Sequence, residues 1–296
     1  MGIVDKIRRF FLEQPRASVV FQISPSYLAA LKVGPEREAV SNFVYHPLSP
    51  GVVEAGLFQK NVLQPGLLLG LVEESLKKLK PEGDSTAVIL PEMSSRVFIL
   101  PLENSGMSAS EQKKFVEWRL GSQLSRPVSE LRYSYQSFNS GRQRRLLVLC
   151  TGEQVAEEYE KLFRETRLKP GKLIVPSIAV LNLVMRTEPV AGEFLLVDVD
   201  ADYLSLIAME AGSPYLYRQK QIWSGYQKDQ TSILKEIENT IQFMEDRNRK
   251  KPDLVWLRST FDDSLWLLEE IKKLTGVRVE EVRAEQKFLE PLLGGI

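Results

Sequence analysis

Histidine and cysteine are almost absent from this sequence, which contains one of each in 296 residues. The single cysteine, Cys150, excludes a disulfide within the chain, and its position after the apolar run 146–149 predicts a buried, reduced thiol. The single histidine, His46, excludes histidine-rich metal sites and leaves a catalytic triad only if His46 is its base. Because Pro47 follows it, His46 is expected to end a strand rather than to act in catalysis.

Net charge and long apolar runs are also missing. Lys plus Arg and Asp plus Glu both total 39, so the composition gives no electrostatic reason to expect nucleic acid as a partner. No apolar run approaches the length of a membrane span, and no cleavable signal peptide is evident. The remaining composition, 43% apolar and 26% charged, is typical of a soluble globular protein with room for two cores.

The first 16 residues form an amphipathic pattern of their own. Ile7 and Phe10 accompany Arg8 and Arg9, as in a helix that lies on an anionic membrane surface. The same pattern suits a helix that docks on its own domain. Both interpretations stay open, and residues 1–16 are treated as a separate N-terminal segment.

The clearest feature of the chain is a pattern of three strands that occurs twice. Residues 194–219 predict three short strands joined by two turns that are rich in Asp, Gly, Ser and Pro. Residues 19–46 repeat this order of strand, turn and strand, and the copies align at a constant offset that places Gln22 on Asp198. The repeat predicts a duplicated α/β chain of two lobes.

Helices and strands alternate through the rest of the chain. Ser108 and Glu111 form a capping box for an expected helix, and Thr151 with Gln154 predicts a second one. Residues 187–192 contain the best domain boundary. The expected helices are 67–80, 108–124, 155–163, 177–185, 231–249, 265–274 and 288–296, and the further strands are 86–90, 96–102, 132–138, 146–151, 173–175, 254–258 and 277–282.

Several short motifs occur between these elements. Leu-Pro pairs end two expected strands, at 90–91 and 100–101, and a Pro-Val-Ser-Glu-Leu turn follows at 127–131. A Leu-Lys-Pro motif stands at 168–170, and a helix with a Lys-Glu-Ile start covers 235–243. In order and spacing, these motifs resemble those of the PilM-type proteins of type IV pilus assembly, which belong to the actin-like superfamily. The likeness spans nearly the whole chain.

The resemblance implies a duplicated actin-like, ribonuclease H-like α/β fold. Its first lobe would cover residues 17–190 and its second lobe residues 191–296. An inserted subdomain of the kind found in FtsA and PilM would occupy about 91–145 of the first lobe.

The first nucleotide-binding turn of this superfamily is altered here. In such ATPases two glycine-containing turns face each other across a cleft, because only glycine lets backbone N–H groups approach a phosphate closely, and an Asp holds the metal. In this chain Gln22 stands at the acidic position and Ser24-Pro25 at the glycine pair. Proline has no N–H to offer to a phosphate.

The other two nucleotide motifs are altered as well. The second turn keeps Asp198 but places Asp200 where glycine is expected, and the third glycine turn is replaced by Ser259-Thr260. A carboxylate about 4 Å from a phosphate charge costs roughly 4 kcal/mol at an effective dielectric near 20. All of these changes predict a degenerate fold, a pseudo-ATPase that neither binds ATP tightly nor hydrolyses it, with no cofactor and no metal.

The resemblance implies a scaffold rather than an enzyme. It suggests a bacterial cytoplasmic protein, peripheral to the inner membrane, that binds the short cytoplasmic tail of a bitopic PilN-like membrane protein. A pilus motor ATPase and a second copy of the chain are further possible partners. Cytoplasmic domains of type II secretion platforms share this architecture, so the choice among pilus, secretion and transformation systems stays open.

A candidate groove for the tail follows from the same resemblance, which places it where the inserted subdomain meets the first lobe. The expected lining residues are Val97, Ile99 and Leu100 of a strand with Val116 and Leu120 of a helix. The other interpretation of each residue is an ordinary core position.

Two other functions compete with the scaffold. One is a nucleotide-binding PilM-type assembly factor that uses Mg²⁺ and ATP. The other is a Mg²⁺-dependent phosphohydrolase in which Asp198, Asp200 and Asp202 would hold the metal, with Asp262-Asp263 as later ligands. The second is disfavoured, because a strand rather than a helix is expected after the acidic cluster.

Overall fold

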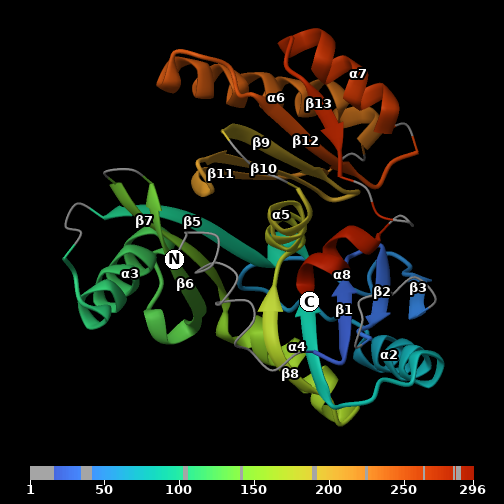
Figure 1. Ribbon diagram of the computed structural model, residues 1–296. Helices are drawn as coiled ribbons and strands as arrows, with labels where there is room; N and C mark the ends of the chain where they lie inside the picture. Colours follow the sequence, from blue (N-terminus) through green and yellow to red (C-terminus); the bar gives the residue numbers. More distant parts are fainter. Residues whose placement is uncertain are drawn as a thin grey trace.

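The computed structural model describes residues 17–34, 42–102, 106–140, 143–188, 192–223, 226–262, 264–282, 284 and 288–296. The amphipathic segment 1–16 lies outside the described residues. Within the described ranges, no helix is both long enough and apolar enough to cross a membrane. Figure 1 shows two large sheets with helices between and outside them, and a smaller sheet with helix α3 to one side.

The first sheet contains the first copy of the repeat. Its strands are β1 (Val19–Ile23), β2 (Tyr27–Lys32), β3 (Phe43–Pro47), β4 (Ser85–Ile89) and β8 (Lys169–Ile174). They lie in the order β3-β2-β1-β4-β8, with β1 antiparallel to β2 and parallel to β4.

The second sheet contains the second copy. Its strands are β9 (Glu193–Val199), β10 (Tyr203–Glu210), β11 (Ser213–Gln221), β12 (Leu254–Ser259) and β13 (Val279–Glu281). The order β11-β10-β9-β12-β13 repeats that of the first sheet, and β9 is again antiparallel to one neighbour and parallel to the other. The predicted duplication is therefore confirmed.

Both sheets are covered on both faces. Along β1, Val19 and Phe21 pack towards α2 (Pro65–Leu79) and α4 (Glu153–Glu165), whereas Val20 belongs to the central core. This alternation follows from the two-residue period of a strand, and it explains why almost every residue of β1 is apolar. Helices α6 (Tyr226–Asn248) and α7 (Ser264–Thr275) cover the outer face of the second sheet in the same way.

The central core lies between the two sheets. Helices α5 (Pro176–Thr187) and α8 (Leu289–Gly295) fill it, and their buried residues pack against strands of both lobes. Figure 1 shows both helices in this middle layer. The close approach of α8 to α5 depends on glycine, because a Cβ at Gly294 would lie 1.7 Å from the carbonyl oxygen of Ala179.

The inserted subdomain is a small antiparallel sheet with one covering helix. Its strands β5 (Ser95–Leu102), β6 (Leu131–Ser140) and β7 (Gln143–Gly152) lie in the order β5-β7-β6, and α3 (Ala109–Leu124) packs on one face. Short 3-10 turns, Glu92–Ser94 and Val128–Glu130, precede β5 and β6. The predicted capping box is confirmed, since Ser108 and Glu111 bind each other's backbone N–H groups.

Two local expectations have clear outcomes. The capping box at Thr151 was wrong: helix α4 begins after Gly152 without a side-chain cap, because the Thr151 hydroxyl donates instead to the carbonyl of Ser94. The structural role expected for His46 is confirmed, since this residue lies in β3, is 9% exposed, and hydrogen-bonds through Nε2 to Ser75 Oγ at 3.1 Å.

Candidate functional site

The two copies of the first hairpin turn face each other between the lobes. Tyr27, just after the first turn, donates its hydroxyl to Asp200 Oδ2 in the second turn at 3.0 Å. Gln22 in turn donates from Nε2 to the Tyr27 hydroxyl at 2.7 Å. Gln22 and Asp198, the equivalent residues predicted from the repeat, are both fully buried. The structure therefore brings the predicted first and second turns into direct contact.

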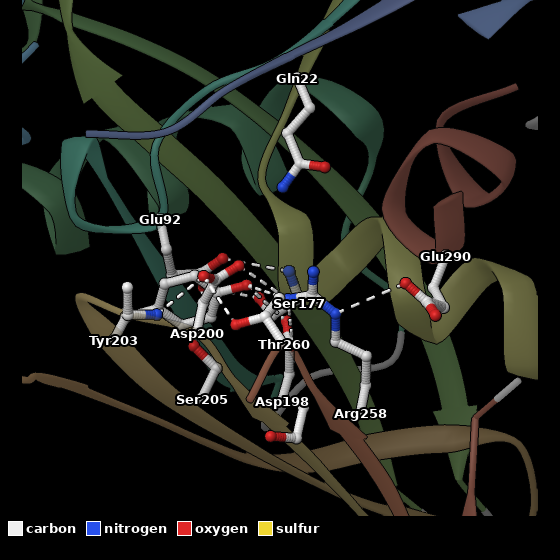
Figure 2. A network of polar contacts seen from close by, with 12 residues as sticks. Gln22, Glu92, Ser177, Asp198, Asp200, Tyr203, Ser205, Arg258, Thr260 and Glu290 are labelled. Carbon is white, nitrogen blue, oxygen red and sulfur yellow. Dashed lines mark hydrogen bonds and ion pairs between the residues drawn. The ribbon is translucent and has the colours of Figure 1, made fainter. Parts of the chain in front are cut away.

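An arginine that the sequence analysis did not single out lies at the centre of this contact. Arg258, on β12, places Nη1 at 3.0 Å from Asp198 Oδ1 and at 3.0 Å from Asp200 Oδ2, and it also donates to the Tyr203 hydroxyl. Its Nε lies 3.8 Å from Glu290 Oε2 of helix α8. Figure 2 shows the guanidinium of Arg258 between the carboxylate of Asp198 and that of Glu290. The side chain is 1% exposed.

Burial and charge act against each other in this cluster. Burial alone would lower the pKa of Arg258, but the carboxylates of Asp198 and Asp200 and the neighbouring Tyr203 raise it well above the ordinary range. Burial raises the pKa of Asp198 to about 7, while Arg258 opposes that shift. The pKa of Asp202 is raised to about 8 by burial and by the charge of Asp200. Arg258 therefore remains a cation, and the carboxylates around it need its charge.

A second polar cluster joins the lobes through Glu92. This residue follows β4, is 1% exposed, and accepts hydrogen bonds at Oε1 from Ser177 at 2.6 Å, Ser205 at 2.9 Å and Tyr217. Its Oε2 accepts from the backbone N–H of Ser177 at 3.0 Å, and Gln219 donates to its backbone carbonyl. Ser205 and Tyr217 belong to the second sheet, so the carboxylate connects the two lobes directly.

The third predicted element lies in the same place. Thr260 donates its hydroxyl to Asp200 Oδ1 at 3.0 Å, and Ala201 N–H donates to the same oxygen at 2.7 Å. The Ser259 hydroxyl instead accepts from the N–H of Phe261, so of this pair Thr260 is the one that hydrogen-bonds to Asp200. Asp200 consequently has four donors from the protein itself.

A magnesium–nucleotide complex does not fit the residues present. In the first turn, Pro25 has no N–H and the N–H of Ser24 already donates to the Tyr27 carbonyl. In the second turn, both carboxylates that would face a metal are held by Arg258. Across the described ranges, no three side chains of Asp, Glu, His or Cys are arranged to hold a metal ion.

A cavity of about 310 Å³ lies between the inserted subdomain and the first lobe. We call it the groove. Its lining residues come from β5 and β7 (Ser95, Val97, Leu147, Leu149, Cys150, Thr151), β6 (132–136), β8 (170–174) and α5 (Ile178, Leu181, Asn182), with Leu90 and Glu160.

The structure corrects most of the groove residues expected from the sequence. Val97 lines the cavity, and Ile99 is partly exposed but does not line it. Leu100, Val116 and Leu120 are 3%, 0% and 0% exposed and pack together in the core of the subdomain under α3. The physical reason is the alternation of a strand, which turns residues 97 and 100 to opposite faces. Those three residues are core positions and do not form a groove wall.

No protein-family model matches this sequence, and no curated protein matches it either. The fold is nevertheless clear from solved structures: two equivalent sheets with helices α5 and α8 between them make this a protein of the actin-like fold. A protein from Bacteroides thetaiotaomicron with an actin-like ATPase fold is similar at a TM-score of 0.54 and 12% identity, over 96% of this chain and 97% of that one.

A structure from type IV pilus assembly has a more similar fold. A chain of the PilM–PilN type IV pilus biogenesis complex is similar at a TM-score of 0.76 and 17% identity, and the match covers 91% of this chain and 89% of that one. The cytoplasmic domain of EpsL, an inner-membrane component of the type II secretion system of Vibrio cholerae, matches at a TM-score of 0.52 and 8% identity over 93% and 92% of the two chains. The fold expected from the sequence is thereby confirmed.

Proposed function

We propose that this protein is a cytoplasmic actin-like scaffold, peripheral to the inner membrane, in the assembly platform of a type IV pilus or a related secretion system. It binds the cytoplasmic tail of a PilN-like membrane protein in the groove between the inserted subdomain and the first lobe. The observation that carries the proposal is this groove, in a chain whose fold matches a component of a PilM–PilN complex.

The shape of the groove favours an extended peptide. Five consecutive residues of β6 and five of β8 line it, and each strand lies at the edge of its sheet. Consecutive lining residues mean that the backbone, as well as alternate side chains, faces the cavity. An edge strand can pair with an added strand, which gives main-chain hydrogen bonds to a peptide of almost any sequence.

The side chains of the groove favour apolar residues in that peptide. Val97, Leu147 and Leu149 form the wall from the subdomain, and Ile178 and Leu181 of α5 form the opposite wall. Such pockets supply specificity by accepting alternate side chains of the added strand. These walls therefore suit a short, extended and mainly apolar peptide tail.

The proposal includes a pseudo-ATPase cleft. The support for it is the cluster around Arg258, in which carboxylates available to a metal are paired with a buried protein cation. Titration of the purified chain with Mg²⁺–ATP, with Mg²⁺ alone as the control, is expected to give no heat of binding. Micromolar binding of ATP would contradict this part of the proposal and would restore the nucleotide-binding assembly factor.

Tail binding is tested by blocking the groove without disturbing the core. Ser134 lines the groove and is exposed, and its neighbours Tyr133 and Tyr135 pack on the other face of the sheet. The Ser134→Trp side chain would therefore fill the cavity. Its matched control is Ser122→Trp, which adds the same side chain to an exposed position of α3 outside the groove.

The measurement is fluorescence anisotropy with a labelled peptide of the cytoplasmic tail of the PilN-like protein from the same organism. The wild type and Ser122→Trp are expected to bind with equal affinity, and Ser134→Trp is expected to bind at least tenfold more weakly. Each tenfold loss corresponds to about 1.4 kcal/mol of binding free energy. Equal binding by Ser134→Trp would show that the tail does not occupy the groove.

A further inference from the structure

Arg258 is a buried charge whose ion-pair partners lie on the second sheet, in the turn after it and on helix α8. It is carried by β12 of the second sheet, and Asp198 and Asp200 belong to the same lobe. Glu290 lies on α8, whose Leu289 and Leu292 are buried in the central core. Figure 2 shows the acidic groups converging on the guanidinium from these separate elements.

The ionised carboxylates of this cluster are stabilised by a cation at its centre. Two carboxylates within 3.0 Å of one guanidinium nitrogen must lie close to each other, and they are 0% and 2% exposed. Like charges at such separations repel strongly in a weakly polar interior, and an unpaired buried charge costs several kcal/mol. The positive charge of Arg258 removes both costs.

We infer that the guanidinium of Arg258 is a built-in cation that takes the place of a bound one and holds the two lobes together. A cation bound in this cleft would have to balance the same carboxylates. Here the balancing charge is part of the chain, and the Tyr27–Asp200 hydrogen bond, which crosses between the lobes, depends on the position that Arg258 gives Asp200. The inference concerns the cleft alone, and it stands whatever partner the groove binds.

The geometry indicates why arginine suits this position. Its Nη1 donates to Asp198, Asp200 and Tyr203, its Nε lies 3.8 Å from Glu290 Oε2, and the guanidinium stays charged when buried. Lysine would supply the charge but not a second nitrogen beside Glu290. A neutral side chain would leave the carboxylates to bind any small cation that enters.

The test is a cation-dependent melting experiment on the full chain. Arg258→Gln is compared with Arg278→Gln, which removes an exposed arginine paired with Glu280 beside β13. The Arg258→Gln protein is expected to melt at least 5 °C below the wild type, and 10 mM MgCl₂ or methylguanidinium chloride is expected to restore at least half of that loss. The wild type and Arg278→Gln are expected to shift by less than 1 °C with either salt.

Two results would overturn the inference. The first is an Arg258→Gln protein that melts with the wild type, and the second is one whose lower melting temperature responds to neither cation. Should Arg258→Gln fail to fold, Arg258→Lys decides the question. A lysine variant that folds, with faster amide hydrogen exchange at residues 24–28 of the facing turn and no response to Mg²⁺, supports a built-in cation. Failure of the lysine variant to fold, although it keeps the charge, overturns the role.

Discussion

Substitution of Glu92 by glutamine tests the second link between the lobes. The Glu92 carboxylate accepts four hydrogen bonds, two of them from Ser177 and the others from Ser205 and Tyr217 of the second sheet. It also caps the first turn of α5 by accepting from the Ser177 N–H, since the N-cap residue Val175 has no side chain that can do so. Glutamine has nearly the same shape as glutamate, so the packing stays intact. The change removes the negative charge and replaces one acceptor oxygen by a donor NH₂ group.

The magnitude follows from the number of donors. If the amide nitrogen of glutamine faced the Ser177 N–H, two donors would meet, and if it faced the three hydroxyl groups, these would have to accept and would lose their bonds to a charged acceptor. A hydrogen bond to a buried charged group contributes about 1.5–3 kcal/mol, and an orphaned buried donor costs about 1–3 kcal/mol. The loss is partly offset, because the variant no longer has the desolvation cost of a buried charge. The expected loss is about 2–4 kcal/mol of unfolding free energy.

Urea unfolding, followed by tryptophan fluorescence and circular dichroism, measures this loss. The matched control is Glu157→Gln, at an exposed position of α4, which is expected to stay within about 0.5 kcal/mol of the wild type. Tyr217→Phe removes a single donor and is expected to lose about 1 kcal/mol. A Glu92→Gln protein as stable as the Glu157→Gln control would refute the reasoning.

Two further substitutions follow from the same structure. Gly294→Ala would place a Cβ against the carbonyl of Ala179, so it should separate α8 from α5. It should lower the free energy of unfolding by at least about 2 kcal/mol and speed amide hydrogen exchange in α8. The control Gly70→Ala, which adds a Cβ in open space on α2, should do neither. Asp202 has a folded-state pKa raised to about 8, so its protonated form favours folding and that contribution is lost as the pH rises from about 4 to 8. The free energy of unfolding of Asp202→Asn should therefore fall less over this pH range, and the variant should be more stable than the wild type at pH 9. Equal slopes of unfolding free energy against pH for the two proteins would contradict the raised pKa of Asp202.

The sequence was sufficient for the fold because its information is local and repeated. The strand, turn and strand order around Gln22 and Asp198 predicted two equivalent sheets, and the structure has them. The capping box at Ser108 and the apolar faces of the helices depend on neighbours within a few residues. Such patterns are visible in one chain without knowledge of its tertiary contacts.

The sequence was insufficient where function depends on contacts between distant residues. Arg258 closes a short strand and looks like a solvent-facing residue, and nothing near it in sequence reveals Asp198, 60 positions away. Glu92 follows a Leu-Pro pair and looks like part of a turn, although its partners are 85 or more positions away. The available signal was weak: each is a charged residue at or just beyond the end of an apolar strand, where burial demands a partner.

The two inter-lobe clusters also bear on how the groove is held. Ser177, which binds Glu92, is followed directly on α5 by Ile178, which lines the groove. Asn182 and Lys172, on the same cavity, donate to the carbonyls of Gly294 and Gly295 at the end of α8, and the start of α8 carries Glu290 towards Arg258. The groove wall is thus built on the helices that the clusters fix between the lobes. Because those helices are held by the chain's own charges, we propose that the wall keeps its shape without a ligand between the lobes, as a constitutive docking site for a peptide would require.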